Sequence, residues 1–326
     1  QYGVRIFQGM YNSMDWEGDP IATNIDPQTG AIGDLAWSDT AGELLKGTGA
    51  ADRNIFTSNN STAYEFATGN ANSLPEIAPG IHISGAEINY MRGDHSNEPI
   101  FRERDFKLGD IVHSEPFLHK GVIYIGANDG MLHAFDASTG NELFAYVPDI
   151  VYPKLDANDD GVVDLTDPGY DHQPGFYVDA TAHVYTFGTA AGTATGHSYL
   201  AAGLGKGGKG VYSLKVDDAT DADNLSASDF FNWEFDEGDD NDSPTDIGYV
   251  YGRAYVVKTR GGPAVIFGNG YNSESEEAAL YILHAEDQNN DNRGDIMRKF
   301  QPQDGTSPDC NGMSSPAIVD YDLNGL

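Results

Sequence analysis

The sequence predicts an all-β protein built from repeated four-stranded units. Short runs of β-branched and aromatic residues, separated by Gly, Asn and Asp, recur along the chain, whereas sustained helical periodicity is scarce. One order of four such runs also returns several times, which is typical of an architecture assembled from repeats. With 326 residues, of which 39% are hydrophobic, the chain is long enough for a large buried core.

The repeat is clearest in "HSEPFLHKGVIYIGANDGMLHAFDASTGNELFAYVP", residues 113–148, which contains four strand-like runs: "EPFLH", "VIYIGAND", "MLHAFDA" and "ELFAYVP". The same order returns at 179–235 and at 252–300, and residues 313–325 begin another copy. Residues 4–37 resemble a diverged earlier copy. Each copy spans about 50–75 residues with its loops and holds four strands, which is the pattern of a β-propeller blade.

We therefore predict a modified β-propeller of four-stranded blades with loop insertions, and about seven blades when complete. A four-stranded sheet cannot bury both of its faces alone, so we expect Phe144, Trp233 and Phe300 to fill the space between stacked blades. Residues 105–326 read as clear blade repeats, whereas residues 1–104 are expected to hold one or more diverged blades and an irregular insertion. The chain has no initiator Met and stops inside a turn, so further sequence is expected on both sides.

The charge of the chain limits its partners. There are 18 Lys and Arg residues against 51 Asp and Glu residues, a net charge of −33. Nucleic acids and anionic membranes need clustered basic residues, so this composition argues against both and favours divalent cations. No apolar run approaches the roughly 18 residues of a membrane span. The single cysteine, Cys310, gives no internal disulfide, and its pairing outside the chain stays open beside an inert core thiol.

The stretch "DANDDGVVDLTD", residues 156–167, has the spacing of a calcium-binding loop. Oxygen ligands stand at positions 1, 3, 5, 7 and 9, where the seventh residue offers its carbonyl: Asp156, Asn158, Asp160, Val162 and Asp164. Gly161 occupies the sixth position, which needs a permissive backbone, and Asp167 the twelfth, where an Asp chelates less readily than Glu. Pro153 and Pro168 exclude long flanking helices. We expect a Ca²⁺ loop inserted between blades; the alternative is a solvated acidic turn.

Two further stretches repeat part of this spacing. In "DQNNDNRGD", residues 287–295, Asn292 replaces the glycine and Arg293 brings a cation close, but four oxygen ligands are correctly spaced: Asp287, Asn289, Asp291 and Asp295. The stretch "DYDLNG", residues 320–325, begins a third loop whose last ligands would lie beyond the chain: Asp320, Asp322 and Asn324. Ca²⁺ is therefore the expected cofactor.

Other motifs point to no reaction, and we expect the protein not to be an enzyme. There is no G-x-S-x-G elbow of a nucleophilic serine. The glycine-rich "GLGKGGKG", residues 203–210, runs into a strand and not into a helix, so it reads as a hairpin turn and not as a phosphate loop. The tripeptide Arg-Gly-Asp occurs at 92–94 and at 293–295, but so short a motif arises often by chance in a Gly- and Asp-rich chain.

The sequence of residues 105–148 closely resembles the C-terminal propeller domain of the PilC/PilY family of type IV pilus tip proteins. It reads "DFKLGDIVHSEPFLHKGVIYIGANDGMLHAFDASTGNELFAYVP". The motifs "INYMRGD", "GLGKGGKGVYSL", "VIFGNGYNS" and "SSPAIVDYD" also appear in the family's order, so the resemblance covers roughly residues 85–326. The sequence "GANDGMLHAFDASTG" is also similar to a blade of the quinoprotein dehydrogenases.

The resemblance implies a modified propeller whose Ca²⁺ loop lies on an inter-blade insertion, matching the five residues from Asp156 to Asp164 given above. It implies a protein secreted through the periplasm to the cell surface, at the tip of the type IV pilus. There it would work with minor pilins and the pilus filament, control extension, retraction and twitching, and adhere to host or abiotic surfaces through an N-terminal region absent here. A quinoprotein-dehydrogenase-like enzyme and a structural scaffold propeller remain as alternatives.

Overall fold

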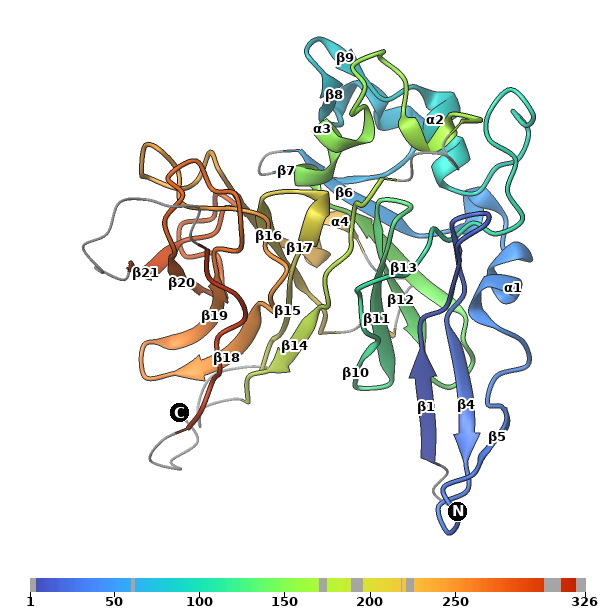
Figure 1. Ribbon diagram of the computed structural model, residues 1–326, viewed down its shortest axis with the longest axis horizontal. Helices are drawn as coiled ribbons and strands as arrows, with labels where there is room; N and C mark the ends of the chain where they lie inside the picture. The colour runs from blue at the N-terminus through green and yellow to red at the C-terminus, as the bar shows by residue number, and fades with distance from the viewer. Residues whose placement is uncertain are drawn as a thin grey trace.

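The computed structural model describes residues 4–59, 62–169, 175–188, 196–217, 219–220, 226–301 and 312–320. Strands dominate these residues, and the helices between them are short (Figure 1). Three sheets stand side by side, and each contains four antiparallel strands in sequence order. The all-β propeller architecture predicted from the sequence is therefore confirmed.

The three sheets are called the first, second and third blades. Their strands match the three predicted copies to within one residue: β10 (Phe117–His119), β11 (Val122–Ala127), β12 (Met131–Asp136) and β13 (Glu142–Val147); β14 (His183–Thr186), β15 (Ser198–Gly203), β16 (Gly210–Lys215) and β17 (Phe231–Asp236); β18 (Tyr255–Thr259), β19 (Gly262–Gly268), β20 (Leu280–His284) and β21 (Ile296–Phe300). A register shift interrupts the pairing of the third and fourth strands in every one of these blades. The blades therefore repeat in structure as well as in sequence.

The first strand of each blade lies against the first strand of the next, because β10 contacts β14 and β14 contacts β18. His183 joins all three blades, since its ring lies 5.1 Å from that of Phe117 and 5.4 Å from that of Tyr255. The turn at η6 (Gly205–Gly207) joins β15 to β16, so the stretch "GLGKGGKG" is the hairpin turn that the sequence predicts. This arrangement places the first strands innermost, as in a propeller.

The N-terminal part forms smaller sheets beside the first blade. Strands β1 (Val4–Gln8), β4 (Ile21–Ile25) and β5 (Ile32–Leu35) make a three-stranded sheet that reaches away from the blades at the lower right of Figure 1. Between β1 and β4 lie β2 (Tyr11–Asn12) and β3 (Glu17–Gly18), which pair as a hairpin, and after β5 come α1 (Ala41–Lys46) and η1 (Ala50–Asp52).

The insertion extends the first blade in a way that the sequence did not predict. Strand β6 (Ile55–Asn59) pairs in parallel with β13, and β7 (Thr62–Glu65) pairs with β6, which makes a six-stranded sheet. The remaining elements gather at the top of Figure 1: η2 (Thr68–Ser73), β8 (Glu76–Ala78), β9 (Ile81–His82), α2 (Gly85–Met91), η3 (Asp149–Val151), α3 (Tyr152–Leu155) and η4 (Asp164–Thr166). Helix α4 (Ala227–Phe230) precedes β17. None of the described helices is long and apolar enough to cross a membrane.

Aromatic side chains fill the space between blades, as predicted for two of the three residues named. Phe144 and Trp233 are fully buried, and the indole N–H of Trp233 donates a hydrogen bond of 3.2 Å to the carbonyl of Ala285 in the third blade. The prediction for Phe300 is wrong, because 53% of that residue is exposed. Phe300 ends β21, the outer strand of the third blade, where no described strand covers it.

Candidate metal centre

The predicted Ca²⁺ loop lies between the first and second blades, after α3 and up to η4. The four-residue helix α3 is anchored by two fully buried side chains, Tyr152 and Leu155, and it places Asp156 at 2% exposure. The loop is therefore flanked by single turns and not by the two long helices of a helical calcium hand, as its prolines predicted.

The side chain of Asp156 holds the loop in a tight curl. Its two carboxylate oxygens accept hydrogen bonds from the backbone amides of Asp160, at 3.0 Å, and of Gly161, at 2.9 Å. The amide of Asp160 also lies 3.0 Å from the side-chain oxygen of Asn158. The backbone of the loop therefore curls around its first and third positions.

The second half of the loop closes the same turn. The carboxylate of Asp160 accepts from the amide of Val162 at 2.9 Å, and that of Asp164 reaches back to accept from the amide of Ala157 at 3.0 Å. Gly161 has a φ of +81°, a left-handed conformation that glycine adopts at little cost, which explains the glycine at the sixth position.

The negative charges of the loop act on one another at Asp164. Burial raises the pKa of Asp164, and the negative charges of Asp156, Asp160 and Asp167 raise it further. Carboxylates that oppose each other's ionisation at close range are stabilised by a multivalent cation. Asp167 itself is exposed, and its carboxylate accepts a hydrogen bond of 2.7 Å from the amide of Gly169.

The loop is also fixed to the insertion above it. One carboxylate oxygen of the buried Glu87 accepts from the amide of Val163 at 2.7 Å, and the other accepts from the amide of Ser84 at 2.7 Å. Ser84 and Glu87 form the capping box of α2, so the same carboxylate that begins this helix holds the loop. Sequence reasoning missed Glu87, although the pattern Ser-x-x-Glu before an apolar run was readable.

The second predicted loop, residues 287–295, shares four side-chain to backbone hydrogen bonds with the first loop. In both loops the side chains at positions 1, 3, 5 and 9 accept hydrogen bonds from the backbone amides at positions 6, 5, 7 and 2, respectively. In the second loop these hydrogen bonds join Asp287 to Asn292 at 2.9 Å, Asn289 to Asp291 at 3.1 Å, Asp291 to Arg293 at 3.0 Å and Asp295 to Gln288 at 2.9 Å. Asn292 has a φ of +58° and so adopts the left-handed conformation of the missing glycine. Asn tolerates this conformation better than most residues.

The third predicted stretch is described only at Asp320, which is partly buried. Asp322 and Asn324 lie outside the described residues, as does Cys310.

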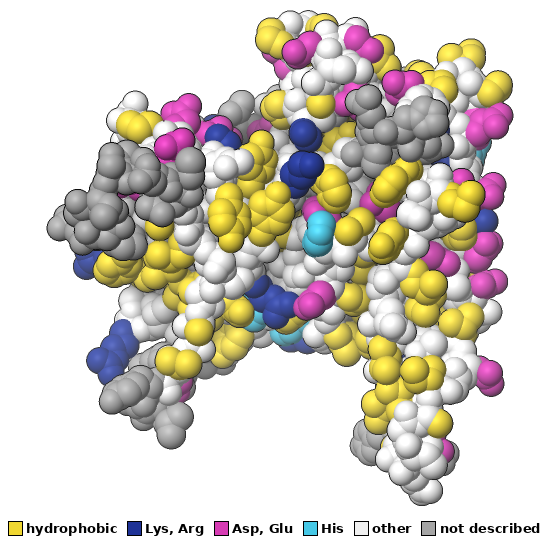
Figure 2. All heavy atoms as spheres, viewed as in Figure 1, with side chains coloured by type: hydrophobic (Ala, Val, Ile, Leu, Met, Phe, Trp, Pro, Cys, Tyr) yellow, Lys and Arg dark blue, Asp and Glu magenta, His cyan; other side chains and the backbone are white. Residues whose placement is uncertain are grey.

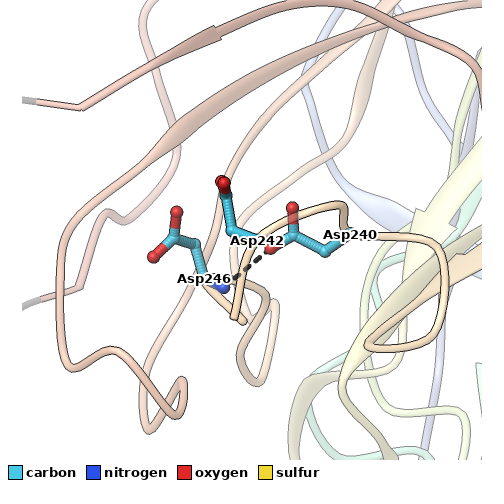
Figure 3. A group of neighbouring side chains, drawn as sticks. All are labelled: Asp240, Asp242 and Asp246. Carbon is cyan, nitrogen blue, oxygen red and sulfur yellow. Dashed lines mark hydrogen bonds between the residues drawn. The ribbon is translucent and has the colours of Figure 1, made fainter. Parts of the chain in front are cut away.

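A further acidic group, which sequence reasoning missed, could hold a metal ion. Asp240, Asp242 and Asp246 bring one carboxylate oxygen each within 4.8 Å of the others, and Figure 3 shows them on one loop after β17. The ammonium of Lys299, on β21, lies 3.0 Å from Asp240 and also contacts Asp242 and Asp246. Burial opposes the charge, but the three carboxylates together raise the pKa of Lys299. The lysine therefore stands where a cation would.

Both Arg-Gly-Asp tripeptides are part of the fold. The guanidinium of Arg92 is buried and donates to the carbonyls of Ala50, Phe66 and Arg53 at 3.0, 2.7 and 2.6 Å. The guanidinium of Arg293 forms an ion pair with Asp239. Each arginine is held by the chain itself, which does not favour recognition of either tripeptide by a receptor.

The surface agrees with the net charge of −33. On the face in Figure 2, acidic side chains spread along the upper and right-hand edges, whereas Lys and Arg occur in a few separate places. Neither the concentrated basic patch of a nucleic-acid-binding protein nor a broad basic surface is seen on this face.

The fold and its insertions define a β-propeller with inserted acidic loops as the class of protein. A family described as "PilY1 beta-propeller domain" matches residues 115–326, which is more than half of the chain. The chain therefore belongs to this family.

Among the relatives is the type IV pilus biogenesis factor PilY1 of Pseudomonas aeruginosa, 29% identical over 356 residues, which cover 96% of this chain and 28% of that protein. A PilY1 homolog of Xylella fastidiosa is 31% identical and covers 86% of this chain and 23% of its own length. The crystal structure of the P. aeruginosa PilY1 C-terminal domain matches 63% of this chain and 34% of that chain, with 32% identity and a TM-score of 0.45. The chain thus spans about a quarter of the length of the curated relatives.

Proposed function

We propose that this chain is the Ca²⁺-binding propeller of a type IV pilus biogenesis factor, without enzymatic activity of its own. Its place in the PilY1 family and the names of its relatives support the pilus role. The observation that carries the Ca²⁺ proposal is the curl of residues 156–164, in which backbone amides donate hydrogen bonds to the side-chain oxygens of Asp156 and Asp164.

The first site would use five protein ligands. Ca²⁺ takes six to eight oxygens at about 2.3–2.6 Å, and water or Asp167 would complete the shell. The protein ligands are Asp156, Asn158, Asp160 and Asp164 through their side chains and Val162 through its carbonyl. Three carboxylates among these ligands repel one another until a divalent cation neutralises them, so binding would order the loop.

The second site would lie in residues 287–295, with ligands Asp287, Asn289, Asp291 and Asp295 and the carbonyl of Arg293. Its support is the position-by-position agreement of its hydrogen bonds with those of the first loop. We expect weaker binding here, because the guanidinium of Arg293 is close and Asn292 holds a left-handed conformation that glycine would adopt more readily.

In this proposal the ordered first loop fixes a docking surface. The loop is joined through Glu87 to α2 and the rest of the insertion, so its order would also set the position of that region. The docking partners would be minor pilins at the tip of the filament, outside the cell. The Ca²⁺-dependent order of the loop would control pilus extension and retraction. Adhesion to a surface would need other parts of a longer protein, because this chain spans only 28% of the length of its P. aeruginosa relative.

Calorimetric titration of the chain with Ca²⁺ tests the first site. Asp156→Ala and Asp164→Ala should each weaken binding at least tenfold, because each removes an anionic ligand. The matched control is Asp159→Asn, which removes one charge from the fourth position of the same loop, where the pattern uses no ligand. Unchanged affinity in the two alanine variants, or an equal loss in the control, would show that the assignment is wrong.

Surface pili, twitching and the position of the protein on the filament test the pilus role. The full-length gene carrying Asp156→Ala should give fewer pili and less twitching, whereas Asp159→Asn should behave as the natural gene does. Immunogold labelling should place the protein at filament tips. If Asp156→Ala abolishes Ca²⁺ binding but leaves piliation and twitching intact, the ion serves stability alone and the proposed regulatory role is wrong.

A further inference from the structure

We propose that Glu234 couples the Ca²⁺ loop at 156–164 to the third blade, so that an ion bound between the first and second blades tightens the contact between the second and third. The proposal rests on the proposed Ca²⁺ site at 156–164 and deepens it. It does not need an ion in residues 287–295.

Glu234 is a buried residue of β17 whose side chain crosses from the second blade into the first. One oxygen accepts hydrogen bonds from the hydroxyls of Tyr146, at 2.6 Å, and Ser58, at 2.9 Å. Tyr146 lies on β13 and Ser58 on β6, so the carboxylate joins the second blade to the extended sheet of the first.

The same carboxylate holds the start of the segment that leads into the Ca²⁺ loop. The amide of Asp149 donates to one oxygen at 2.9 Å, and the amide of Ile150 donates to the other at 3.1 Å. These amides belong to η3, which continues into α3 and ends at Asp156, the first proposed ligand. The hydroxyl of Tyr152 adds a hydrogen bond of 3.0 Å to Thr57, so the connecting turn is packed on both sides.

The backbone of Glu234 is bonded to the third blade. Its N–H donates to the carbonyl of Asn292 at 3.4 Å, and its carbonyl accepts from the amide of Gly294 at 3.1 Å, which makes a parallel bridge with Arg293. A Cβ at Gly294 would lie 2.9 Å from the Cβ of Phe235, so the two segments are in close contact. One residue thus contacts the segment before the first loop and the interior of the loop at 287–295.

Coupling follows from how these contacts are shared. An ion bound by Asp156 would fix the short helix before it. It would thereby also fix the amides of Asp149 and Ile150, which donate hydrogen bonds to Glu234. A carboxylate held by four donors restrains its own backbone, and hence the bridge to residues 292–294. The coupling is reciprocal: whatever tightens the bridge must also strengthen Ca²⁺ binding at the first loop by the same factor.

Amide hydrogen exchange with and without Ca²⁺ tests the coupling. The measurement uses a chain carrying Asp287→Asn and Asp291→Asn, which keep the acceptor oxygens of the second loop but remove two carboxylates, so that a direct effect of an ion there is suppressed. Calorimetry first confirms that this chain binds Ca²⁺ at one site. Saturating Ca²⁺ should then slow exchange of the Glu234 and Gly294 amides roughly tenfold, in addition to the amides of the first loop.

Two variants on that chain separate the outcomes. Glu234→Gln has nearly the same shape as the natural side chain. In this variant Ca²⁺ should still slow amide exchange within residues 156–164, but most of the slowing at Gly294 should be lost. Its Ca²⁺ affinity should fall by about the factor by which the slowing at Gly294 is reduced. Asp156→Ala should lose both effects, and it is informative even if Glu234→Gln fails to fold. Slowing at Gly294 that persists in either variant, or a bound ion that changes only the first loop, would overturn the coupling. A chain that binds no Ca²⁺ at all would overturn the proposed site itself.

Discussion

Arg53 and Glu142 form a bidentate ion pair with no exposure of the arginine side chain, although 89 residues separate them. The guanidinium donates from Nε and Nη2 to the two carboxylate oxygens at 2.7 and 2.8 Å. Glu142 begins β13 of the first blade, whereas Arg53 lies two residues before β6. The pair therefore fastens the insertion to the blade at the place where β6 adds to the sheet.

Removing Arg53 should be costly. Arg53→Met leaves Glu142 buried with one cationic partner fewer, and breaking a buried pair on one side costs about 3–5 kcal/mol of unfolding free energy. The exposed pair of Lys46 and Glu43, at 2.9 Å, supplies the control, since Lys46→Met should cost less than about 0.5 kcal/mol. Urea denaturation measures both, and equal losses would contradict the role of the buried pair.

Stability should fall as the pH rises through the range of His133. Burial opposes its charge, but Asp129 and Glu142 outweigh burial and raise the pKa of His133 to about 9. Because this value lies above the unfolded one, the stabilisation is complete below about pH 6.5 and is lost between pH 6.5 and 9, by up to about 3 kcal/mol. His133→Gln should flatten this part of the profile. An unchanged slope in the variant would assign the loss to other groups.

Replacing Lys299 should convert the carboxylates of Asp240, Asp242 and Asp246 into a cation site. Lys299→Met removes the ammonium that bridges them, so without metal the melting temperature should fall by about 5 °C. Calorimetry should then show one Ca²⁺ more per chain than in the natural protein. Adding Asp242→Asn to the variant should remove the extra ion. An unaltered stoichiometry in Lys299→Met would show that these carboxylates do not converge closely enough.

The backbone of Gly161 should matter for Ca²⁺ affinity. Gly161→Ala places a side chain at a φ of +81° and a Cβ 3.1 Å from Cδ1 of Ile81, which should cost about 1–2 kcal/mol and weaken Ca²⁺ binding roughly tenfold. Gly169→Ala, just beyond the loop, is the matched control and should bind Ca²⁺ normally. Full affinity in Gly161→Ala would mean that the ordered loop adopts another curl.

The blades were predictable because each contains its own signals. The strands of 113–148 pair with their sequence neighbours across short turns, so local alternation and turn residues are sufficient to find them. The parallel pairing of β6 with β13 was not predictable, because it joins residues about ninety positions apart and leaves no local pattern. Phe300 shows the same limit: its size suggested burial, but only the neighbouring strands decide it.

The candidate site divides in a similar way. The spacing of Asp156 to Asp164 predicted a curl whose hydrogen bonds the structure contains, since such loops are local. Glu234 and Lys299 come from distant elements, so spacing could not find them. The pattern of Glu87 indicated a helix cap, but not its contact with the loop. The acidic run "DEGDDNDSPTD" at 236–246 was a readable sign of Asp240, but its cationic partner lies 59 residues further on.

The central claim is that residues 156–164 hold a Ca²⁺ ion, and anomalous diffraction from crystals grown with CaCl₂ tests it most directly. The claim predicts an anomalous peak in the first loop about 2.3–2.6 Å from oxygens of Asp156, Asp160 and Asp164 and from the carbonyl of Val162. The peak should be absent from crystals of Asp156→Ala. A natural chain whose loop shows no peak at saturating Ca²⁺ would contradict the claim.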